Sequence, residues 1–357
     1  MQEYIFSENE VDKGYNAIFL CGVKYNKGNS DKRNVLKKYL EDLDEKNKVI
    51  ILEENFKFGK STRRYLSYDD IFMKNLKDIE TLTAIFSDKV FIIHESISTA
   101  AEFGMFATNK LLNGKLCLLT PNEYSVEETK ITAFLRLAFF YEENNIRNIV
   151  FYPEVEQWKT SQFKSDFRTS FFNNKIGINL SNQITDFLNE NKEEKISINF
   201  KKAVFGKYSN SKNDISYFDD RKNNKLKIKI STQIIKTHII SFFKLLDFRT
   251  EIRTNKNLTD HITYIERFYK RILLNTISER EGKLFDNIVV SCKDCNLEFR
   301  RIISYTLYLL QAMKLINLVQ SEENTEERKI SITMDFENLI MLYDSLIEDK
   351  INTIIEE

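Results

Sequence analysis

Five short apolar runs in the first part of this 357-residue chain constrain its fold more than any other feature. Each run is bounded by charged or turn residues, and none alternates cleanly between apolar and polar side chains. Such runs are typical of parallel strands that are buried on both faces of a sheet. The runs are Ala17–Leu20, Val49–Leu52, Val90–Ile93, Leu116–Leu119 and Ile149–Tyr152.

The segments between these runs have the apolar periodicity of helices. After the first run, Val35, Leu36, Tyr39, Leu40 and Leu43 share one face. Further helices are expected over 66–86 (one or two helices), 99–112, with Gly114 just beyond its end, and around Phe134, Leu135, Ala138 and Phe139. This alternation predicts an α/β domain with a doubly wound, five-stranded parallel sheet of the flavodoxin or Rossmann type.

The rest of the chain has a different pattern. We expect the α/β domain over residues 1–155, a linker or small irregular subdomain over 156–224, and a mainly helical domain over 225–357. In the last of these, Leu297–Leu318 has the pattern of one long helix, and a charged loop and the alternating run Ile330–Met334 follow it. A helix followed by strand, polar tip and strand predicts the last helix and wing of a winged helix-turn-helix domain.

Composition narrows the possible classes of protein. The formal net charge is zero, so any contact with nucleic acid must come from a local patch. Four cysteines are too few for a disulfide framework, and the Cys292–Cys295 pair lacks the further cysteines or histidines of a zinc site. We therefore expect no metal and a structural role for that pair. The absence of a signal peptide and of a long apolar run predicts a cytoplasmic protein without a membrane anchor.

The segment from Val90 to Phe106 carries the most chemistry, because a strand, a hydroxyl-rich turn and a helix follow one another. Glu102 is expected in the first turn of that helix, at the carboxyl end of a strand, where open α/β sheets bind ligands. A carboxylate there can attack, or electrostatically stabilise, an anomeric carbon whose bond to a base is breaking. The alternative is a glutamate that only favours the helix dipole.

Other residues at the same edge are candidates for substrate binding. Ser96, Ser98 and Thr99 can bind a phosphate or a ribose hydroxyl together with free backbone N–H groups, although ordinary N-capping is the alternative. Cys21 and Gly22 end the first strand, and a glycine there lets a ligand approach the backbone. The three spaced glycines of a dinucleotide fingerprint are absent, which argues against an ordinary NAD-dependent dehydrogenase.

The acidic residues near the second and third strands differ in the edge of the sheet at which we expect them. Glu53 and Glu54 follow the second strand and therefore belong to the same edge of the sheet as Glu102. Asp88 precedes the third strand, which places it at the opposite edge and favours a role in a turn or cap. Glu80 lies on the helical stretch between these strands and can face either way.

Taken together, these residues resemble the nucleoside 2-deoxyribosyltransferase-like enzymes, and most closely the effector proteins of that type in bacterial retrons, which are anti-phage defence systems. The resemblance is carried by Ile18–Gly22, Glu95–Ser96 and the Glu102, Gly104, Phe106 pattern. It covers residues 15–155 well and the C-terminal part loosely. It implies that Glu102 is the catalytic nucleophile and that Gly104 belongs to the substrate site.

The resemblance implies a toxic N-glycosidase that acts on NAD, a nucleoside or a nucleotide, with no further cofactor. It also implies a partner reverse transcriptase with its branched RNA–DNA hybrid (msDNA), and it leaves a homo-oligomer open. Cations that could contact this partner or its nucleic acid are Arg300, Arg301, Lys314, Arg328 and Lys329. The alternative function is a nucleotide-sensing, DNA-binding regulator in which the same sheet binds a ligand without cleaving it.

Overall fold

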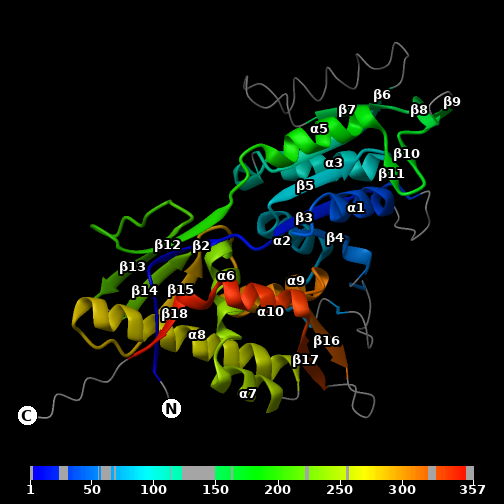
Figure 1. Cartoon of the computed structure of the whole chain (residues 1–357). Helices are drawn as coiled ribbons and strands as arrows, with labels where there is room; N and C mark the ends of the chain where they lie inside the picture. Colours follow the sequence, from blue (N-terminus) through cyan, green and yellow to red (C-terminus); the bar gives the residue numbers. More distant parts are fainter. Residues whose placement is uncertain are drawn as a thin grey trace, which may run out of the picture. The chain divides into compact units, whose positions relative to one another are not determined.

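The computed structural model divides into two compact units, each made of segments that are distant in sequence (Figure 1). It describes residues 3–23, 31–54, 56–57, 66–67, 70–112, 114–122, 149–161, 164–221, 225–254, 257–320 and 327–350. The parallel-sheet unit comprises Tyr15–Glu54 and Ile79–Glu193. The mixed-sheet unit comprises Met1–Gly14, Asn55–Asp78 and Glu194–Glu357.

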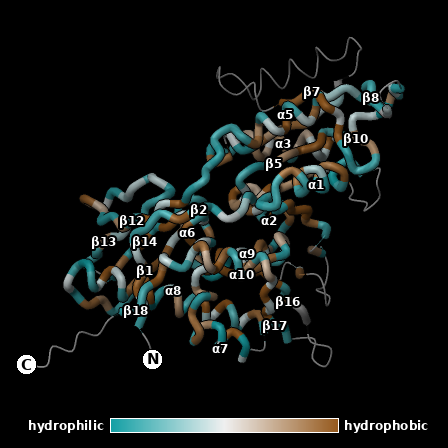
Figure 2. The backbone as a smooth tube through the Cα atoms, viewed as in Figure 1, coloured by the Kyte–Doolittle hydropathy of each residue, from teal (hydrophilic) through white to brown (hydrophobic). Residues whose placement is uncertain are grey.

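The parallel-sheet unit is built on five strands in the order β4-β3-β5-β6-β7, and all neighbours run parallel. The five predicted apolar runs form these strands, which confirms the five-stranded parallel sheet. The side chains of β5 are all buried, whereas those of β7 alternate between partly exposed and buried, and the hydrophobic stretch at β7 is plain in Figure 2. The strands are β3 (Asn16–Cys21), β4 (Asn47–Ile50), β5 (Lys89–Ile93), β6 (Leu116–Asn122) and β7 (Ile149–Pro153).

Helices pack on both faces of this sheet. One face, which includes Ile18 and Leu20 of β3, packs against α1 (Lys32–Leu43) and α5 (Ile178–Asn189). On the other face, Phe19 of β3 makes an edge-on ring contact with Phe106 of α3 (Ile97–Ala107). Because side chains alternate along a strand, Cys21 points to the same face as Phe19.

Two helix predictions need correction. Among the described residues of the expected helix over 66–86, only α2 (Leu76–Phe86) is helical, and the Asp70 carboxylate accepts the Ser67 N–H before it. The helix expected over 99–112 begins earlier, at Ile97, and is followed by the short 3₁₀ helix η2 (Lys110–Leu112). Gly114 has a φ of +76°, as a chain reversal at this point requires. The helix expected around Phe134 lies outside the described residues.

The segment 156–224 contributes to both units. The hairpin of β8 (Glu156–Ser161) and β9 (Lys164–Arg168), the short pair β10 (Phe171–Phe172) and β11 (Lys175–Ile176), and α5 belong to the parallel-sheet unit. The strands β12 (Lys195–Lys202) and β13 (Asp214–Asp220) belong to the mixed-sheet unit.

The mixed-sheet unit contains a second five-stranded sheet with the order β15-β14-β13-β12-β2. The added strands are β2 (Asn9–Asp12), β14 (Lys225–Ile230) and β15 (Ile288–Cys292). A separate antiparallel pair joins β1 (Tyr4–Phe6) to β18 (Ile347–Asp349), which follows the 3₁₀ turn η4 (Asp344–Leu346). The N-terminal strands therefore complete sheets whose other strands lie late in the sequence.

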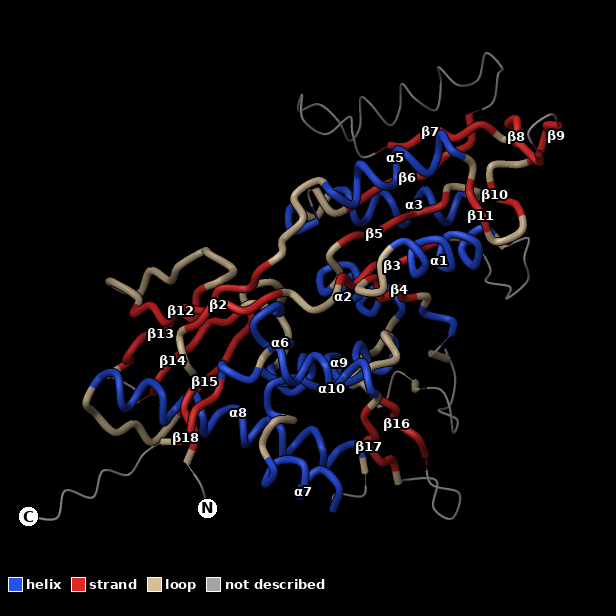
Figure 3. The backbone as a smooth tube through the Cα atoms, in the orientation of Figure 1, coloured by secondary structure: helices blue, strands red, loops and turns tan. Residues whose placement is uncertain are grey.

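The described part of the mixed-sheet unit also contains helices, and one of them ends earlier than expected. They are α6 (Thr232–Phe242), α7 (Leu246–Thr254), α8 (Leu258–Glu281), α9 (Phe299–Ala312) and α10 (Met334–Leu342). The predicted helix 297–318 stops at Ala312 because Lys314 adopts a φ of +59° and the Leu315 N–H turns back to the Leu310 carbonyl. The strands β16 (Ile316–Gln320) and β17 (Arg328–Ile332) then form an antiparallel hairpin (Figure 3). The predicted order of helix and hairpin is present, while the winged-helix assignment stays a prediction.

Candidate functional site

The strand order of the parallel sheet points to one edge as the place for a ligand. Numbered along the chain, the order is 2-1-3-4-5, so the connections leaving the first and third strands run to opposite sides. Open sheets of this type bind ligands at the carboxyl ends of those two neighbouring strands. In this protein they are β3, which ends at Cys21, and β5, which ends at Ile93.

The turn after β5 is a tightly closed helix cap. The hydroxyl of Ser96 accepts the Thr99 N–H at 3.3 Å, and the Thr99 hydroxyl accepts the N–H groups of Ser96 and Glu95 at 3.1 Å and 3.2 Å. Ser98 is exposed, and its hydroxyl lies 2.8 Å from that of Ser96. The N-capping alternative is thus confirmed for Ser96, whereas binding of substrate by these hydroxyls stays a prediction.

Glu102 lies in the second turn of α3, not in the first turn as expected, because Ser96 rather than a later residue caps the helix. The field of a helix N-terminus acts mainly within the first turn, so the dipole explains this glutamate poorly. Its Oε2 is buried, and no hydrogen-bond donor among the described residues reaches it. Burial raises the pKa of Glu102 to about 7, with Arg33 opposing the shift and Glu53 adding to it.

Three further groups share the electrostatic environment of Glu102. Glu80 of α2 also has its pKa raised to about 7, by burial and then by the charges of Glu102 and Glu53. Burial, Glu102 and Glu80 together raise the pKa of the Cys21 thiol well above its ordinary value. Glu53 belongs to the 3₁₀ helix η1 (Leu52–Glu54) after β4. The carboxyl edge of the sheet therefore gathers three carboxyl groups, from α2, η1 and α3.

Arg33, in the first turn of α1, supplies the counter-charge to this cluster. The side chain is 4% exposed, and Nη1 donates to Glu53 Oε1 at 3.0 Å and to Oε2 at 3.2 Å. Nη2 donates to the Val23 carbonyl. A Cβ on Gly22 would lie 3.0 Å from Cδ of Arg33, so the glycine leaves room for this arginine against the strand end.

Sequence reasoning missed Arg33 and left Glu80 open. Arg33 could have been found from its position in the first helical turn after β3. The carboxyl ends of β3 and β4 share one edge of the sheet, so this turn lies at the same edge as Glu53, which follows β4. For Glu80, the sequence predicted a helix but not the residue at which that helix begins. The helix begins at Leu76, and this start determines which face of the helix carries Glu80.

A second cation lies near the turn after β5. Lys32 Nζ is 2.7 Å from Glu95 Oε1, and it donates to the Tyr152 hydroxyl at 3.2 Å. Tyr152 is at the end of β7, and the Lys32 ammonium also lies 5.5 Å from its ring centre. The edge thus offers a partly exposed ammonium group on one side and the carboxyl cluster on the other.

Two of the remaining candidates are placed simply. Gly104 lies within α3, two residues after Glu102. Asp88 precedes β5 at the opposite end of the sheet, where its carboxylate accepts the Ala17 N–H at 2.8 Å. This contact confirms the structural role expected for Asp88.

The C-terminal cations differ in their availability. Arg328 is 3% exposed, lies 3.6 Å from Asp70 and donates to the Leu318 carbonyl, so it is a buried structural cation and not a surface one. Arg300 is partly buried and donates to the Thr263 hydroxyl at 2.9 Å.

The other three cations are nearer to the surface. Arg301 lies 3.9 Å from Glu298 on its own helix and is partly exposed, while Lys314 and Lys329 are exposed. They are the better candidates for contact with a partner.

Comparison with known proteins identifies the family. No curated protein showed a match to the chain. Across the described residues, no helix combines the length and apolar composition needed to span a membrane. Residues 29–318 match the model of a family described as STM3845 retron effector protein, and this match spans most of the chain. The protein therefore belongs to the STM3845 retron effector family, and its role is that of an effector in a retron defence system.

Proposed function

We propose that this retron effector is an N-glycosidase of the nucleoside 2-deoxyribosyltransferase-like type, with Glu102 as its nucleophile. Its substrate is NAD, a nucleoside or a nucleotide. The observation that carries the proposal is a carboxyl group with a buried Oε2 that accepts no hydrogen bond from any described residue, beside the end of β3 at the topological switch point. Burying a carboxylate without partners costs stability, and function is the usual reason for such an arrangement.

The chemistry follows from the charges. As the bond between the anomeric carbon and the base breaks, the base leaves with the bonding electrons and the sugar develops positive charge. An ionised Glu102 stabilises that charge and forms a bond to the anomeric carbon, and water then releases the sugar. Burial raises the pKa of both Glu80 and Glu102 to about 7, and the charge of Glu102 adds to the shift of Glu80, so near neutral pH each carboxyl group is partly protonated. One of them can then act as the nucleophile while the other transfers a proton.

We further propose that a partner holds this activity silent, namely the retron reverse transcriptase with its msDNA. The support is the family itself and the surface cations Arg301, Lys314 and Lys329 on and around α9 and the β16–β17 hairpin. Cations near a phosphate backbone give binding that weakens as salt rises. In this proposal the helix and hairpin serve as a winged-helix contact to the partner.

The direct experiment incubates the purified full-length protein with NAD and a panel of nucleosides and nucleotides, and follows release of the free base by chromatography. The proposal expects base release from at least one of these compounds. Binding of a compound without release of its base would instead support a nucleotide-sensing regulator.

A further inference from the structure

We propose that Cys292 and Cys295 form a reversible oxidation site, a dithiol that a small-molecule disulfide such as oxidised glutathione converts into an intramolecular disulfide. Cys292 is the last residue of β15, Cys295 lies in the turn between β15 and α9, and both are partly exposed. Cys21 and Cys117, the other cysteines of the chain, are buried. The sequence predicted a structural role for the pair. The two cysteines belong to the mixed-sheet unit and Glu102 to the parallel-sheet unit, so this proposal is independent of the proposed glycosidase chemistry.

The turn holds the two sulfur atoms close together. Ser291 and Glu298 form an antiparallel bridge that closes the loop containing both cysteines. Within it, the Asp294 N–H donates to Cys292 Sγ at 3.3 Å, and only two residues separate Cys292 from Cys295. A disulfide requires the two Cα atoms to lie within about 7 Å, and a four-residue turn allows that separation.

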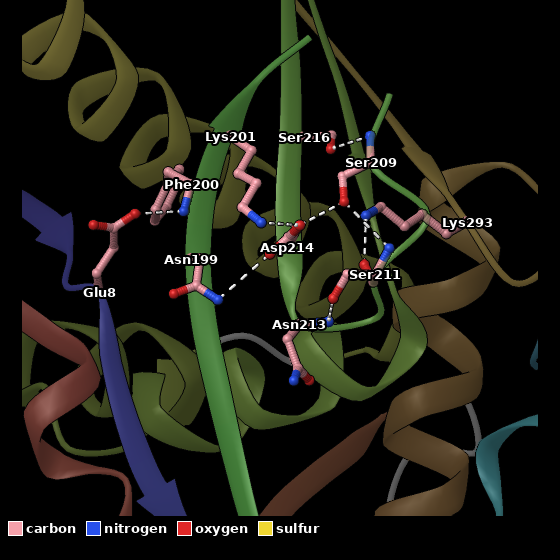
Figure 4. A network of polar contacts seen from close by, with 10 residues as sticks. All are labelled: Glu8, Asn199, Phe200, Lys201, Ser209, Ser211, Asn213, Asp214, Ser216 and Lys293. Carbon is pink, nitrogen blue, oxygen red and sulfur yellow. Dashed lines mark hydrogen bonds and ion pairs between the residues drawn. The ribbon is translucent and has the colours of Figure 1, made fainter. Parts of the chain in front are cut away.

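Contacts on both sides anchor this turn in the mixed-sheet unit. The Lys293 N–H donates to the Ile230 carbonyl at 2.9 Å, and its ammonium donates to the Ser211 carbonyl at 2.8 Å (Figure 4). Asp294 Oδ2 accepts the backbone N–H and the hydroxyl of Thr232, the first residue of α6, at 2.6 Å and 2.8 Å. The loop is therefore ordered before oxidation, which lowers the entropic cost of joining the two sulfurs.

The two thiols differ in acidity in the way that a dithiol site requires. The hydrogen bond from Cys292, together with the Leu297 N–H, lowers the pKa of Cys295, while the same contact and burial raise the pKa of Cys292. Asp294 is the nearest carboxylate and opposes ionisation of both. Cys295 is thus the attacking thiolate and Cys292 the resolving thiol.

The reaction balances as two thiol–disulfide exchanges. The Cys295 thiolate attacks one sulfur of oxidised glutathione, and one glutathione thiolate leaves. Cys292 then loses its proton to solvent and attacks Cys295 Sγ, which releases the second glutathione thiolate. The protein loses two hydrogens and the oxidised glutathione gains them. Among the described residues, no group of three His, Cys, Asp or Glu side chains could hold a metal ion.

The test uses the reduced full-length protein, treated with oxidised glutathione and then labelled with N-ethylmaleimide in denaturant for mass measurement. Before oxidation all four cysteines should take the label. Afterwards only Cys21 and Cys117 should take it, the peptide with residues 292–295 should have lost two hydrogens, and dithiothreitol should restore four labels. A chain that still takes four labels, or that retains glutathione without an internal bond, would overturn the proposal.

Two single variants test the order of attack, each checked for folding by its thermal melting curve. The Cys292→Ser variant should keep one glutathione on Cys295, because no resolving thiol remains. The Cys295→Ser variant should react on the order of tenfold more slowly, because burial and the Asp294 carboxylate still raise the pKa of Cys292 when the contact with Cys295 is gone. Equal rates in the two variants would overturn the assignment of Cys295 as the attacking thiolate.

Discussion

Arg33 and Glu53 form a bifurcated contact at the carboxyl edge of the parallel sheet, in which Nη1 of the arginine donates to both carboxylate oxygens, at 3.0 Å and 3.2 Å. The arginine is buried and the glutamate is about one third exposed. The charge of Arg33 lowers the pKa of Glu102, whereas Glu53 raises it. Burial has the largest effect on the ionisation of Glu102, this ion pair modifies it, and the first three predictions depend on the pair or on the neighbouring Glu80.

Removal of the Arg33 charge should move the pH dependence of the glycosidase. In Arg33→Met the pKa of Glu102 rises, because the cation that favours its ionised form is gone. A nucleophile must be ionised, so the acid limb of the profile of kcat/KM against pH should shift to higher pH. The matched control is Lys38→Met, which removes a cation from the same helix whose ammonium bonds to Asn174. An unchanged profile in Arg33→Met would show that Arg33 does not influence the ionisation of Glu102.

Gly22→Ala should destabilise the protein through Arg33. The new Cβ would lie 3.0 Å from Cδ and 3.2 Å from Cγ of an arginine that is already bound to Glu53 and Val23. We expect a loss of about 1–3 kcal/mol in the free energy of unfolding, the usual cost of overpacking. A double-mutant cycle measured by urea unfolding isolates the cause. The cost of Gly22→Ala should fall by at least half in the Arg33→Met background, and an equal cost in both backgrounds would show that the clash is elsewhere.

Glu80 should make stability depend on pH. Its pKa of about 7 in the folded protein lies above the ordinary value of 4.5, so folding favours the protonated form. That contribution is complete below about pH 4.5 and is lost as pH rises through 7. A glutamine at position 80 does not ionise, so the Glu80→Gln variant has no such pH-dependent loss. The stability of the variant relative to wild type should therefore increase between pH 5 and pH 8. Solvent screens a partly exposed group, so we expect a change on the order of 1–2 kcal/mol.

Thermal unfolding of both proteins at the two pH values measures this difference. A relative stability that stays constant between pH 5 and pH 8 would mean that Glu80 titrates normally. The kinetic counterpart is that Glu80→Gln should move the acid limb of the activity profile to lower pH, because one charge that disfavours ionisation of Glu102 is removed.

The surface cations should govern retention of the retron partner. Charge reversal at Arg301 and Lys329 should weaken co-purification with the reverse transcriptase and msDNA and raise toxicity in cells, because phosphate contacts become repulsive. Lys110→Glu, at an exposed position in the parallel-sheet unit, is the control of equal charge change for each single reversal, Arg301→Glu or Lys329→Glu. If the folded Arg301→Glu/Lys329→Glu variant keeps its partner and its toxicity level, the contact surface lies elsewhere.

The parallel sheet could be predicted because its strands are continuous apolar runs, and burial on both faces requires that pattern. The placement of Glu102, Glu53 and Gly22 at one edge could also be predicted, because the carboxyl ends of parallel strands share one edge of the sheet. Arg33 could not be predicted in the same way. A single arginine at a helix start is ordinarily exposed, and its burial depends on Glu53 from another connection and on the room left by Gly22.

The mixed sheet was harder for physical reasons. Strand β2 pairs with β12, which lies far along the chain, so no local pattern reports the pairing. Strand β14 did carry a signal, because Leu226, Ile228 and Ile230 alternate with lysines and are all buried. The apolar residues of β16 continue the helical pattern of α9. The sequence pattern therefore predicts one helix that reaches residue 318. Only the positive φ of Lys314 separates the two elements.

The most direct test of the account compares base release by wild type, Glu102→Gln and Glu95→Gln under identical conditions. Glu95 is a matched control, since it precedes the same helix, is exposed and pairs with Lys32. Glu102→Gln keeps the shape of the side chain but removes the charge that stabilises the developing cation, so its kcat should fall by more than about a hundredfold while folding is preserved. Glu95→Gln should keep activity within about tenfold of wild type, because an exposed ion pair contributes little. A folded Glu102→Gln protein that releases base at a rate close to wild type would contradict the central claim.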